Sequence, residues 1–259
     1  MKYEWTVLSF NLRTNTMEDG PNSFSFRFPF LCEVLNQRLP DLIGFQEITE
    51  DMRLQLTAAL PDYYLVGGGR ETDHLGESSC IAFRKDRFAL DQLDTVWLSQ
   101  SPHTAGSRMG ADQSPCPRVL TCAVLTPLQK GASRFRFYNT HTDHLGAVSR
   151  LLASSQILQR IHDDSRAEML PVLLTGDFNA EPDSPEMRLI AESEIIPLRD
   201  AAGSLGGTFH AFGEMNPPQK IDYIFCSPQV EVLSAELWND RRDGLFLSDH
   251  DAVAVRIRL

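Results

Sequence analysis

The stretch Pro171-Val-Leu-Leu-Thr-Gly-Asp-Phe-Asn179 joins a short apolar run to an acidic turn. The apolar run predicts a buried strand, whose side chains enter an apolar core. A carboxylate at the end of such a strand needs a partner, because an unpaired charge is costly away from water. Ile221-Asp-Tyr-Ile-Phe225 and Ser248-Asp-His-Asp251 carry similar groups. Together the three strings predict a metal site that attacks phosphate esters.

Strands and helices alternate along the rest of the chain. Trp5–Leu12 and Asp41–Glu47 are strand-like, whereas apolar spacing predicts helices at Phe28–Leu39 and Thr49–Leu60, each followed by proline. Further strands are expected at Cys80–Phe83, Phe88–Trp97, Val119–Leu125, Phe135–Asn139, Lys220–Cys226, Val230–Leu237 and Ala252–Leu259, with an amphipathic helix at Gly146–His162. This rhythm predicts two packed mixed sheets flanked by helices, in one domain over residues 1–259.

The overall charge limits the class of partner. The chain has 24 Lys and Arg against 35 Asp and Glu, a net charge of −11. Stable binding to long duplex nucleic acid is therefore not expected, because such binding needs cations that displace counterions from phosphates. A small or locally presented substrate fits better.

The five cysteines and the chain's hydropathy indicate the compartment. The cysteines are odd in number and scattered, which argues against a disulfide framework or a structural zinc site. No stretch approaches roughly 18 consecutive apolar residues, and the N-terminus lacks the apolar core of a signal peptide. We expect a cytoplasmic protein without a transmembrane segment.

Seven polar residues occur at the ends of predicted strands or in the turns that connect them, so they are expected to meet at one edge of a sheet. These residues are Asn11, Glu47, Asp177, Asn179, Asp222, Asp249 and His250. Hard oxygen ligands of this kind favour Mg²⁺ or Mn²⁺ over zinc or copper.

Six motifs along the chain resemble, in sequence and in order, those of the endonuclease/exonuclease/phosphatase superfamily. They are Ser9-Phe-Asn-Leu-Arg13, Gly44-Phe-Gln-Glu47, Thr140-His-Thr-Asp-His-Leu-Gly146, Gly176-Asp-Phe-Asn179, Ile221-Asp-Tyr-Ile-Phe225 and Ser248-Asp-His-Asp251. The resemblance covers nearly the whole chain, and the Asp143-His-Leu-Gly146 part of the third motif resembles a bacterial branch of the superfamily. It implies a four-layer α/β sandwich, with two central mixed sheets between outer helices.

The resemblance also implies a metal centre. Glu47 would be the main metal ligand, with Asn11 and Asp249 beside it, and the ion would be Mg²⁺ or Mn²⁺. Asp177 is the expected base for the attacking water, and Asn179 would hold that water or a phosphoryl oxygen.

Two histidines are implied to flank the scissile phosphate. Glu77 would orient His141 and Asp222 would orient His250, each carboxylate raising the pKa of its imidazole. Arg118 is a candidate for binding the phosphate.

His144 is expected either to contact substrate or to cap the helix that begins near Gly146, and Asp143 is placed to stabilise the start of that helix.

Some aromatic and imidazole groups have two interpretations. Phe24, Phe26, Phe28 and Phe30 would form either a ledge for a lipid or base or, as we favour, part of the core. Three histidines lie in loops and would either face the substrate or, as we favour, lie at the surface: His74, His103 and His210. Specificity should reside in four loops: Asn15–Phe26, Gly67–Gly76, Ser99–Pro117 and Gly203–Gln219.

The expected function is metal-dependent hydrolysis of phosphate esters, with a phosphodiesterase as the first choice and a phosphomonoesterase acting on a sugar phosphate, an inositol phosphate or a nucleotide as the alternative. The substrate would be a nucleotide, a short nucleic-acid end, a sugar phosphate or a lipid head group, since the fold does not choose among them. Two alternatives come from other classes. One is a catalytically silent binding module of the same fold. The other is a serine or cysteine hydrolase, for which the sequence offers no nucleophile motif.

Overall fold

The computed structural model describes residues 3–259 and contains two six-stranded mixed sheets packed face to face. The first has the order β11-β14-β1-β2-β4-β3, with β1 Glu4–Asn11, β2 Leu42–Gln46, β3 Tyr63–Val66, β4 Ile81–Arg84, β11 Glu231–Trp238 and β14 Ala252–Arg258. The second has the order β5-β6-β7-β8-β10-β9, with β5 Phe88–Trp97, β6 Val119–Pro127, β7 Phe135–His141, β8 Val172–Asp177, β9 Arg199–Asp200 and β10 Asp222–Cys226.

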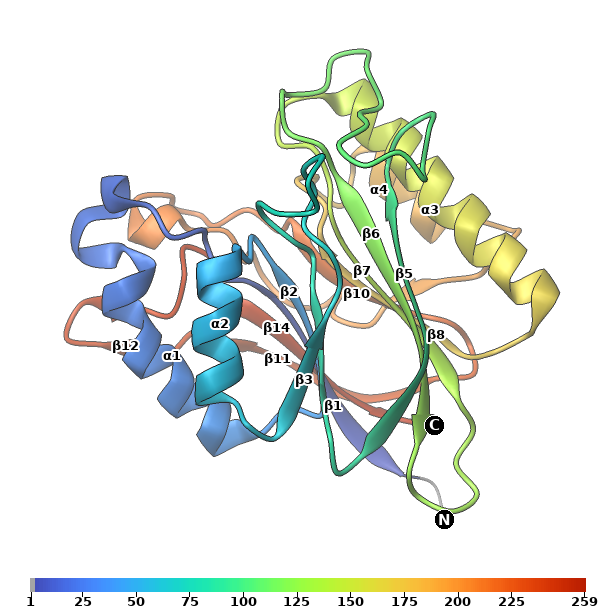
Figure 1. Cartoon of the computed structure of the whole chain (residues 1–259), viewed down its shortest axis with the longest axis horizontal. Helices are drawn as coiled ribbons and strands as arrows, with labels where there is room; N and C mark the ends of the chain where they lie inside the picture. The colour runs from blue at the N-terminus through green and yellow to red at the C-terminus, as the bar shows by residue number, and fades with distance from the viewer. Residues whose placement is uncertain (1–2) are drawn as a thin grey trace.

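Helices cover the outer faces of both sheets (Figure 1). α1 (Phe24–Arg38) and α2 (Glu50–Ala59) share a core with the first sheet, and α3 (Ala147–Ala167) and α4 (Pro185–Ala191) share one with the second. The remaining elements are the short helices η1 Met17–Asn22 and η2 Ala211–Gly213 and a hairpin of β12 Arg241–Arg242 and β13 Leu245–Phe246. The four-layer sandwich is confirmed.

Strand alternation decides which side chains reach the space between the sheets. In β1, Leu8 and Phe10 pack towards the helices, whereas Trp5 and Val7 belong to the core between the sheets. Because alternate residues share a face, the end of that inner row is Asn11. The chain therefore changes from apolar to polar along one face of one strand.

The second sheet repeats this change. In β7, Phe135 and Phe137 lie in the core between the sheets, and the same face ends at His141. In β8, Leu173 lies in that core and Asp177 ends the row. The polar ends of these strands are therefore brought to one rim of the sandwich.

A layer of buried amides and hydroxyls separates the apolar core from that rim. Gln46 Nε2 donates to Asn139 Oδ1 at 2.8 Å, and Thr175 Oγ1 donates to the same oxygen at 3.0 Å. The sheets approach so closely here that a Cβ added to Gly44 would lie 2.0 Å from Thr175 Oγ1. Only glycine fits at this position.

Some boundaries differ from those expected. α1 begins at Phe24, and in this helix Phe24 and Phe30 are buried while Phe26 is 60% exposed. The core interpretation therefore holds for two of these rings, and Phe28 packs partly against them. The short helix α4 was not expected from the sequence, although Ser184 caps its start.

Within the described residues, no helix combines the length and hydropathy needed to cross a membrane.

Candidate active site

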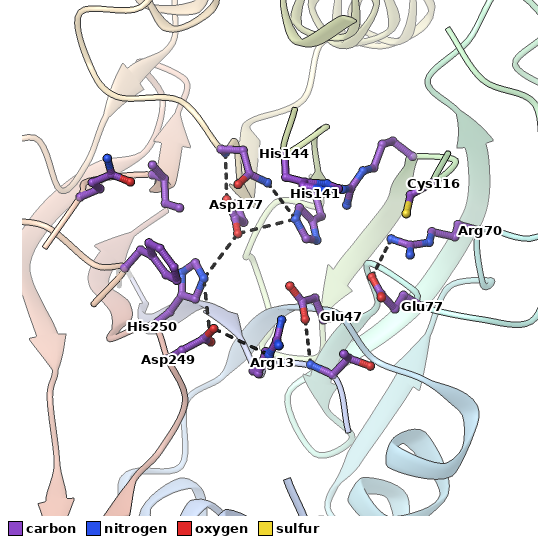
Figure 2. A pocket seen from close by; sticks show the side chains of 16 residues that line it. Arg13, Glu47, Arg70, Glu77, Cys116, His141, His144, Asp177, Asp249 and His250 are labelled. Carbon is purple, nitrogen blue, oxygen red and sulfur yellow. Dashed lines mark hydrogen bonds and ion pairs between the residues drawn. The ribbon is translucent and has the colours of Figure 1, made fainter. Parts of the chain in front are cut away.

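The strand register brings the predicted site residues together. Asp177 of β8 pairs with His141 of β7 on one side and with Asp222 of β10 on the other. In the first sheet, Asn11 pairs with Gln46, the residue before Glu47. The sheet ends border a pocket of about 500 Å³ (Figure 2).

Nine of the eleven predicted site residues line this pocket: Glu47, Glu77, Arg118, His141, His144, Asp177, Asn179, Asp249 and His250. The other two, Asn11 and Asp222, are buried and hydrogen-bonded to lining residues.

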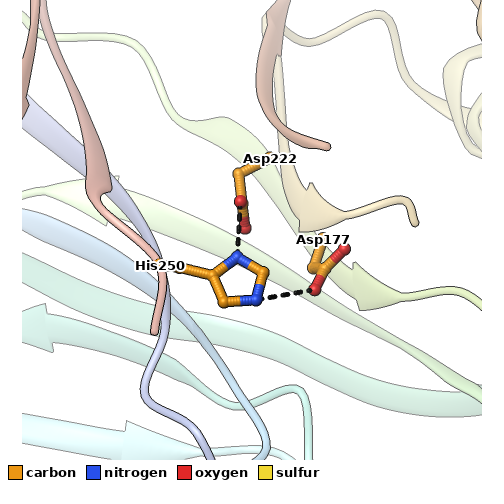
Figure 3. Close-up of side chains that lie close together, drawn as sticks. All are labelled: Asp177, Asp222 and His250. Atoms are coloured by element: carbon orange, nitrogen blue, oxygen red, sulfur yellow. Dashed lines mark hydrogen bonds and ion pairs between the residues drawn. The ribbon is translucent and has the colours of Figure 1, made fainter. Parts of the chain in front are cut away.

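The His250 ring lies between two carboxylates, Asp222 at one ring nitrogen and Asp177 at the other, and we call this the Asp222–His250–Asp177 line (Figure 3). His250 Nδ1 donates to Asp222 Oδ2 at 2.7 Å, and His250 Nε2 lies 3.7 Å from Asp177 Oδ2. Burial acts to lower the pKa of His250, but Asp222, followed by Asp249 and Asp177, outweighs it and raises the pKa to about 10. His250 is therefore a cation at neutral pH, held in orientation by Asp222.

For Asp177, burial outweighs the stabilising charge of the neighbouring histidine, so its neutral form is favoured. Burial, followed by the charge of Asp222, raises the pKa of Asp177 to about 7, against the stabilising effect of His250. Its oxygens accept hydrogen bonds from Asn11 Nδ2 and from the backbone amide of Asn179, both at 2.9 Å. A carboxylate with such a pKa can exchange a proton near neutral pH.

The structure corrects the expectation for Glu77 and His141. Glu77 Oε2 pairs with Arg70 Nη1 at 2.6 Å, and no hydrogen bond joins Glu77 to His141 within residues 3–259. Burial, followed by the charges of Arg118 and Arg70, lowers the pKa of His141 well below its ordinary value. His141 is thus neutral, because it is buried beside two arginines, of which Arg70 was not expected from the sequence.

The neutral His141 has a defined partner. Asn179 Nδ2 lies 3.0 Å from His141 Nε2 and also donates to the carbonyl oxygen of Thr142 at 3.2 Å. Because an amide nitrogen is only a donor, Nε2 accepts, and the imidazole proton is assigned to Nδ1.

The predicted metal ligands surround one side of the pocket. Glu47 accepts hydrogen bonds from Asn11 Nδ2 at 3.1 Å and from the Thr14 amide at 2.8 Å. Burial raises the pKa of Asp249, and although His250 opposes this, the charge of Glu47 adds to it. A carboxylate whose pKa is raised partly by a second carboxylate beside it suits a divalent cation between the two. The donor set of Glu47, Asp249 and Asn11 therefore fits Mg²⁺ or Mn²⁺.

Asp177, Asp222 and His250 also lie close enough to be considered a metal site, with ligand atoms within 4.8 Å of one another. However, both nitrogens of a cationic His250 carry protons and cannot bind a metal. The hydrogen bond from His250 to Asp222 also occupies a carboxylate oxygen. We therefore assign this group to proton handling.

Local backbone geometry directs two of these side chains. Glu47 has φ 62° and Asn179 has φ 48°, in the left-handed region that non-glycine residues rarely adopt. Each follows the end of a buried strand, where the turn aims its side chain at the pocket. Such strain is common at functional sites.

Several pocket residues were not expected as site residues: Arg13, Thr14, Arg70, Cys116, Phe209, Gln219 and Ile221. Arg13 ends a quoted motif, so the sequence carried a signal for it, whereas Arg70 has none beyond its glycine-rich loop. Three of the four proposed specificity loops contribute to the lining; Asn15–Phe26 does not.

His210 is buried, contrary to the expected surface position. Its Nε2 lies 3.2 Å from Asp251 Oδ1, and Arg241 contacts both groups. Its backbone amide donates to the Asp249 carbonyl, so it supports the turn that carries Asp249.

Arg27 connects the chain segments next to Asn11 and Asp249, two of the three predicted metal ligands. This fully buried side chain on α1 donates to the carbonyl oxygens of Leu12 at 2.9 Å, Arg13 at 3.2 Å and Leu247 at 2.5 Å. Leu12 follows Asn11, and Leu247 precedes Asp249 by two residues. One guanidinium therefore holds both segments, with a further hydrogen bond to Asn22.

Arg27→Met is expected to lower the free energy of unfolding by about 3 kcal/mol, because several buried carbonyls lose their donor. Arg38→Met on the same helix is the control. Arg38 pairs with Asp240 in a partly exposed ion pair, so its loss should cost about 1 kcal/mol or less. Urea unfolding measures both changes, and equal losses would contradict the role of Arg27.

Asp143 anchors the loop before α3. Its carboxylate accepts hydrogen bonds from Ser114 and from the backbone amides of Leu145 at 3.1 Å and Gly146 at 2.8 Å. Burial acts to raise the pKa of Asp143, but these hydrogen bonds outweigh it and lower the pKa to about 2.

Asp143→Asn should therefore reduce stability by about 2 kcal/mol at pH 7. A depressed folded pKa gives stability that is present above the ordinary pKa of 3.8 and is lost as pH falls towards 2. The difference from the parent protein should thus shrink across that interval in urea unfolding. Asp73→Asn is the control, because Asp73 is exposed and its oxygen accepts the Leu75 amide, a hydrogen bond that asparagine can keep. A pH-independent difference would contradict this account.

A sequence model of the Endonuclease/Exonuclease/phosphatase family matches residues 8–250. The chain belongs to this family. Solved structures of similar proteins include an endonuclease/exonuclease/phosphatase from Bacteroides vulgatus, 30% identical, with TM-score 0.92 and full coverage of both chains. A mannosyl-6-phosphatase from Bacteroides thetaiotaomicron is 27% identical, with TM-score 0.86 and coverage of 98% of this chain and 99% of that one.

A more distant curated relative of this family member is Carbon catabolite repressor protein 4 homolog 3 of Arabidopsis thaliana. It is 25% identical over an alignment of 228 positions that covers 78% of this chain and 46% of the relative. The chain thus spans less than half the length of that relative. The family and its structural neighbours are hydrolases of phosphate esters.

Proposed function

We propose that this protein is a divalent-metal-dependent hydrolase of phosphate esters. The observation that carries the proposal is the convergence of Glu47 and Asp249 with the Asp222–His250–Asp177 line in one pocket. A silent binding module would not need a carboxylate with a pKa of about 7 beside a cationic imidazole.

Glu47, Asp249 and Asn11 would hold the metal ion. When bound, Mg²⁺ or Mn²⁺ would polarise the phosphoryl oxygen and offset the negative charge that develops there. Asn11 Nδ2 is already used as a donor to Glu47 and Asp177, so its amide also fixes the relative positions of these carboxylates.

The chain's own groups would move and hold the protons. In this proposal Asp177 takes a proton from the attacking water, which lies within reach of Asn179. His250, kept cationic by Asp222, donates a hydrogen bond to a phosphoryl oxygen as its charge grows. The neutral His141 keeps the Asn179 amide in place through Nε2.

The pocket favours a compact substrate. Its lining is mostly charged or polar, and its aromatic ring, Phe209, lies against His250 with centroids 4.9 Å apart. Diesters are the expectation from the sequence. Monoesters of small alcohols are the second candidate, favoured by the pocket's size and by the similarity to a mannosyl-6-phosphatase.

A substrate panel tests the proposal. The protein is assayed with Mg²⁺ and with Mn²⁺ on bis(p-nitrophenyl) phosphate, hexose phosphates, nucleotides, sphingomyelin and short oligonucleotides. Metal-dependent release of phosphate or alcohol from at least one class is the expected result. Absence of hydrolysis across the panel, with intact folding, would support the silent binding module instead.

A further inference from the structure

The pocket has a second, cationic end. Figure 2 shows His250 and Asp249 on one side of Glu47, and Arg70, Glu77 and Cys116 on the other. Arg118 and His144 also belong to the pocket lining. The reaction proposed above uses neither of the two arginines, so their placement needs another explanation.

Arg118 carries donors that nothing in the described chain accepts. Its side chain is 5% exposed, yet Nε and Nη1 lack a hydrogen-bond partner within residues 3–259. Nη2 lies 2.9 Å from His144 Nδ1. Buried guanidinium donors normally have hydrogen-bond acceptors, so the free donors of Arg118 indicate that the acceptor is a bound ligand.

The nearest carboxylate does not fill that role. Asp143 Oδ2 lies 3.6 Å from Arg118 Nε, outside hydrogen-bond distance. Both oxygens of Asp143 are engaged by Ser114, and Oδ1 also accepts the Leu145 and Gly146 amides. Asp143 therefore moderates the charge of Arg118 and leaves its donors free.

Arg70 adds a second partly engaged guanidinium. Its Nη1 pairs with Glu77, whereas its Nε lies 3.5 Å from Glu71 Oε1 in an ion pair and has no hydrogen-bond partner in the described chain. Burial, followed by the charge of Arg70, lowers the pKa of Arg118, so the two cations face each other's field. Both also border a small adjoining cavity of about 10 Å³.

We propose that Arg70, Arg118 and His144 form a subsite for a second oxyanion of the substrate. The inference rests on the proposed function, and it names the substrate class: a small phosphate ester that carries another phosphate or a carboxylate. The scissile phosphate would lie at Glu47 and His250, and the second anion at the arginines. Guanidinium forks suit phosphate and carboxylate oxygens, and adjacent cations are stabilised when an anion binds between them.

Binding measurements on the magnesium-loaded protein test this subsite without relying on turnover. Isothermal titration calorimetry compares ethyl-, propyl- and butylphosphonate with counterparts that carry a terminal phosphonate or a terminal carboxylate. At one chain length, the second anion should tighten Kd by about tenfold or more, because charge-assisted hydrogen bonds are added. The two series separate a phosphate-type from a carboxylate-type ligand.

Matched variants locate the effect. Arg70→Gln and Arg118→Gln should each reduce the preference for the ligand with two anionic groups to threefold or less. Arg118→Lys should retain part of that preference. Arg134→Gln is the control, since Arg134 pairs with Glu168 away from the pocket and its variant should keep the full preference. Thermal unfolding verifies that each variant is folded, and Arg70→Gln carries the test if Arg118→Gln does not fold.

The outcomes separate the two proposals. Equal affinities for ligands with one anionic group and ligands with two, at every chain length, would overturn the subsite, even if the protein hydrolyses the substrate panel. A preference that survives both glutamine variants would also overturn it. Absence of hydrolysis together with a clear preference would instead overturn the proposed function and leave an anion-binding protein.

Discussion

Asp177→Asn is expected to lower kcat by roughly 10³-fold, the size of effect that a lost general base produces. Asparagine keeps the shape, and its one carbonyl oxygen can still accept one of the two hydrogen bonds that Asn11 and Asn179 donate to different oxygens of Asp177, but it cannot take a proton from water. The pKa of Asp177, raised to about 7 by burial and Asp222, places its proton exchange near neutral pH. The loss should therefore appear in turnover, with KM little changed.

Initial rates on the best substrate of the panel measure this loss. Asp163→Asn is the matched control, because the Asp163 side chain is 60% exposed on α3 and lies outside the pocket. The control should retain the parental rate. If Asp177→Asn turned over within a few-fold of the parent, Asp177 would not be the base.

His250→Gln is expected to lower kcat by roughly 10²- to 10³-fold, as for a lost group that stabilises transition-state charge. Glutamine retains a donor but removes the positive charge that Asp222 maintains on His250. Asp222→Asn should cost less, because the imidazole remains in place while its pKa falls. The double variant should be little worse than His250→Gln alone, since the two residues act as a unit.

Rates of the two single variants and the double variant form a thermodynamic cycle. His162→Gln serves as the control for the histidine change, because His162 lies in α3 outside this pocket. Additive losses would show that Asp222 and His250 act separately, against this account.

Much of the fold could be predicted from the sequence, because alternate residues of each strand face the same side of its sheet. The rows Trp5-Val7-Ser9-Asn11 and Leu173-Thr175-Asp177 place apolar residues between the sheets and polar residues at the rim. The helix boundary at Phe24 was missed because apolar residues at every second position do not mark a helical face. α4 was missed because seven residues give too short a pattern.

The site was predictable where a motif carried it. The motifs that contain Glu47, Asp177 and His250 are separated by long stretches of chain, and their residues meet in one pocket. Arg27 was not foreseen, because hydrogen bonds to carbonyls of distant turns leave no local pattern, and Arg70 was not foreseen because it lies in a glycine-rich loop outside the motifs. The expectation that Glu77 orients His141 was wrong for the same reason: the partner of Glu77 is Arg70, which lies in a loop with no recognisable motif.

The most direct test of the central claim is the dependence of hydrolysis on free metal ion. Protein freed of metal with a chelator is assayed on bis(p-nitrophenyl) phosphate and the best panel substrate while Mg²⁺ or Mn²⁺ is titrated back. The account predicts that activity is lost without metal and returns on titration, and that Glu47→Gln needs at least about tenfold more metal for half activation. Hydrolysis that survives the chelator and is abolished by a thiol reagent would contradict it and direct attention to Cys116.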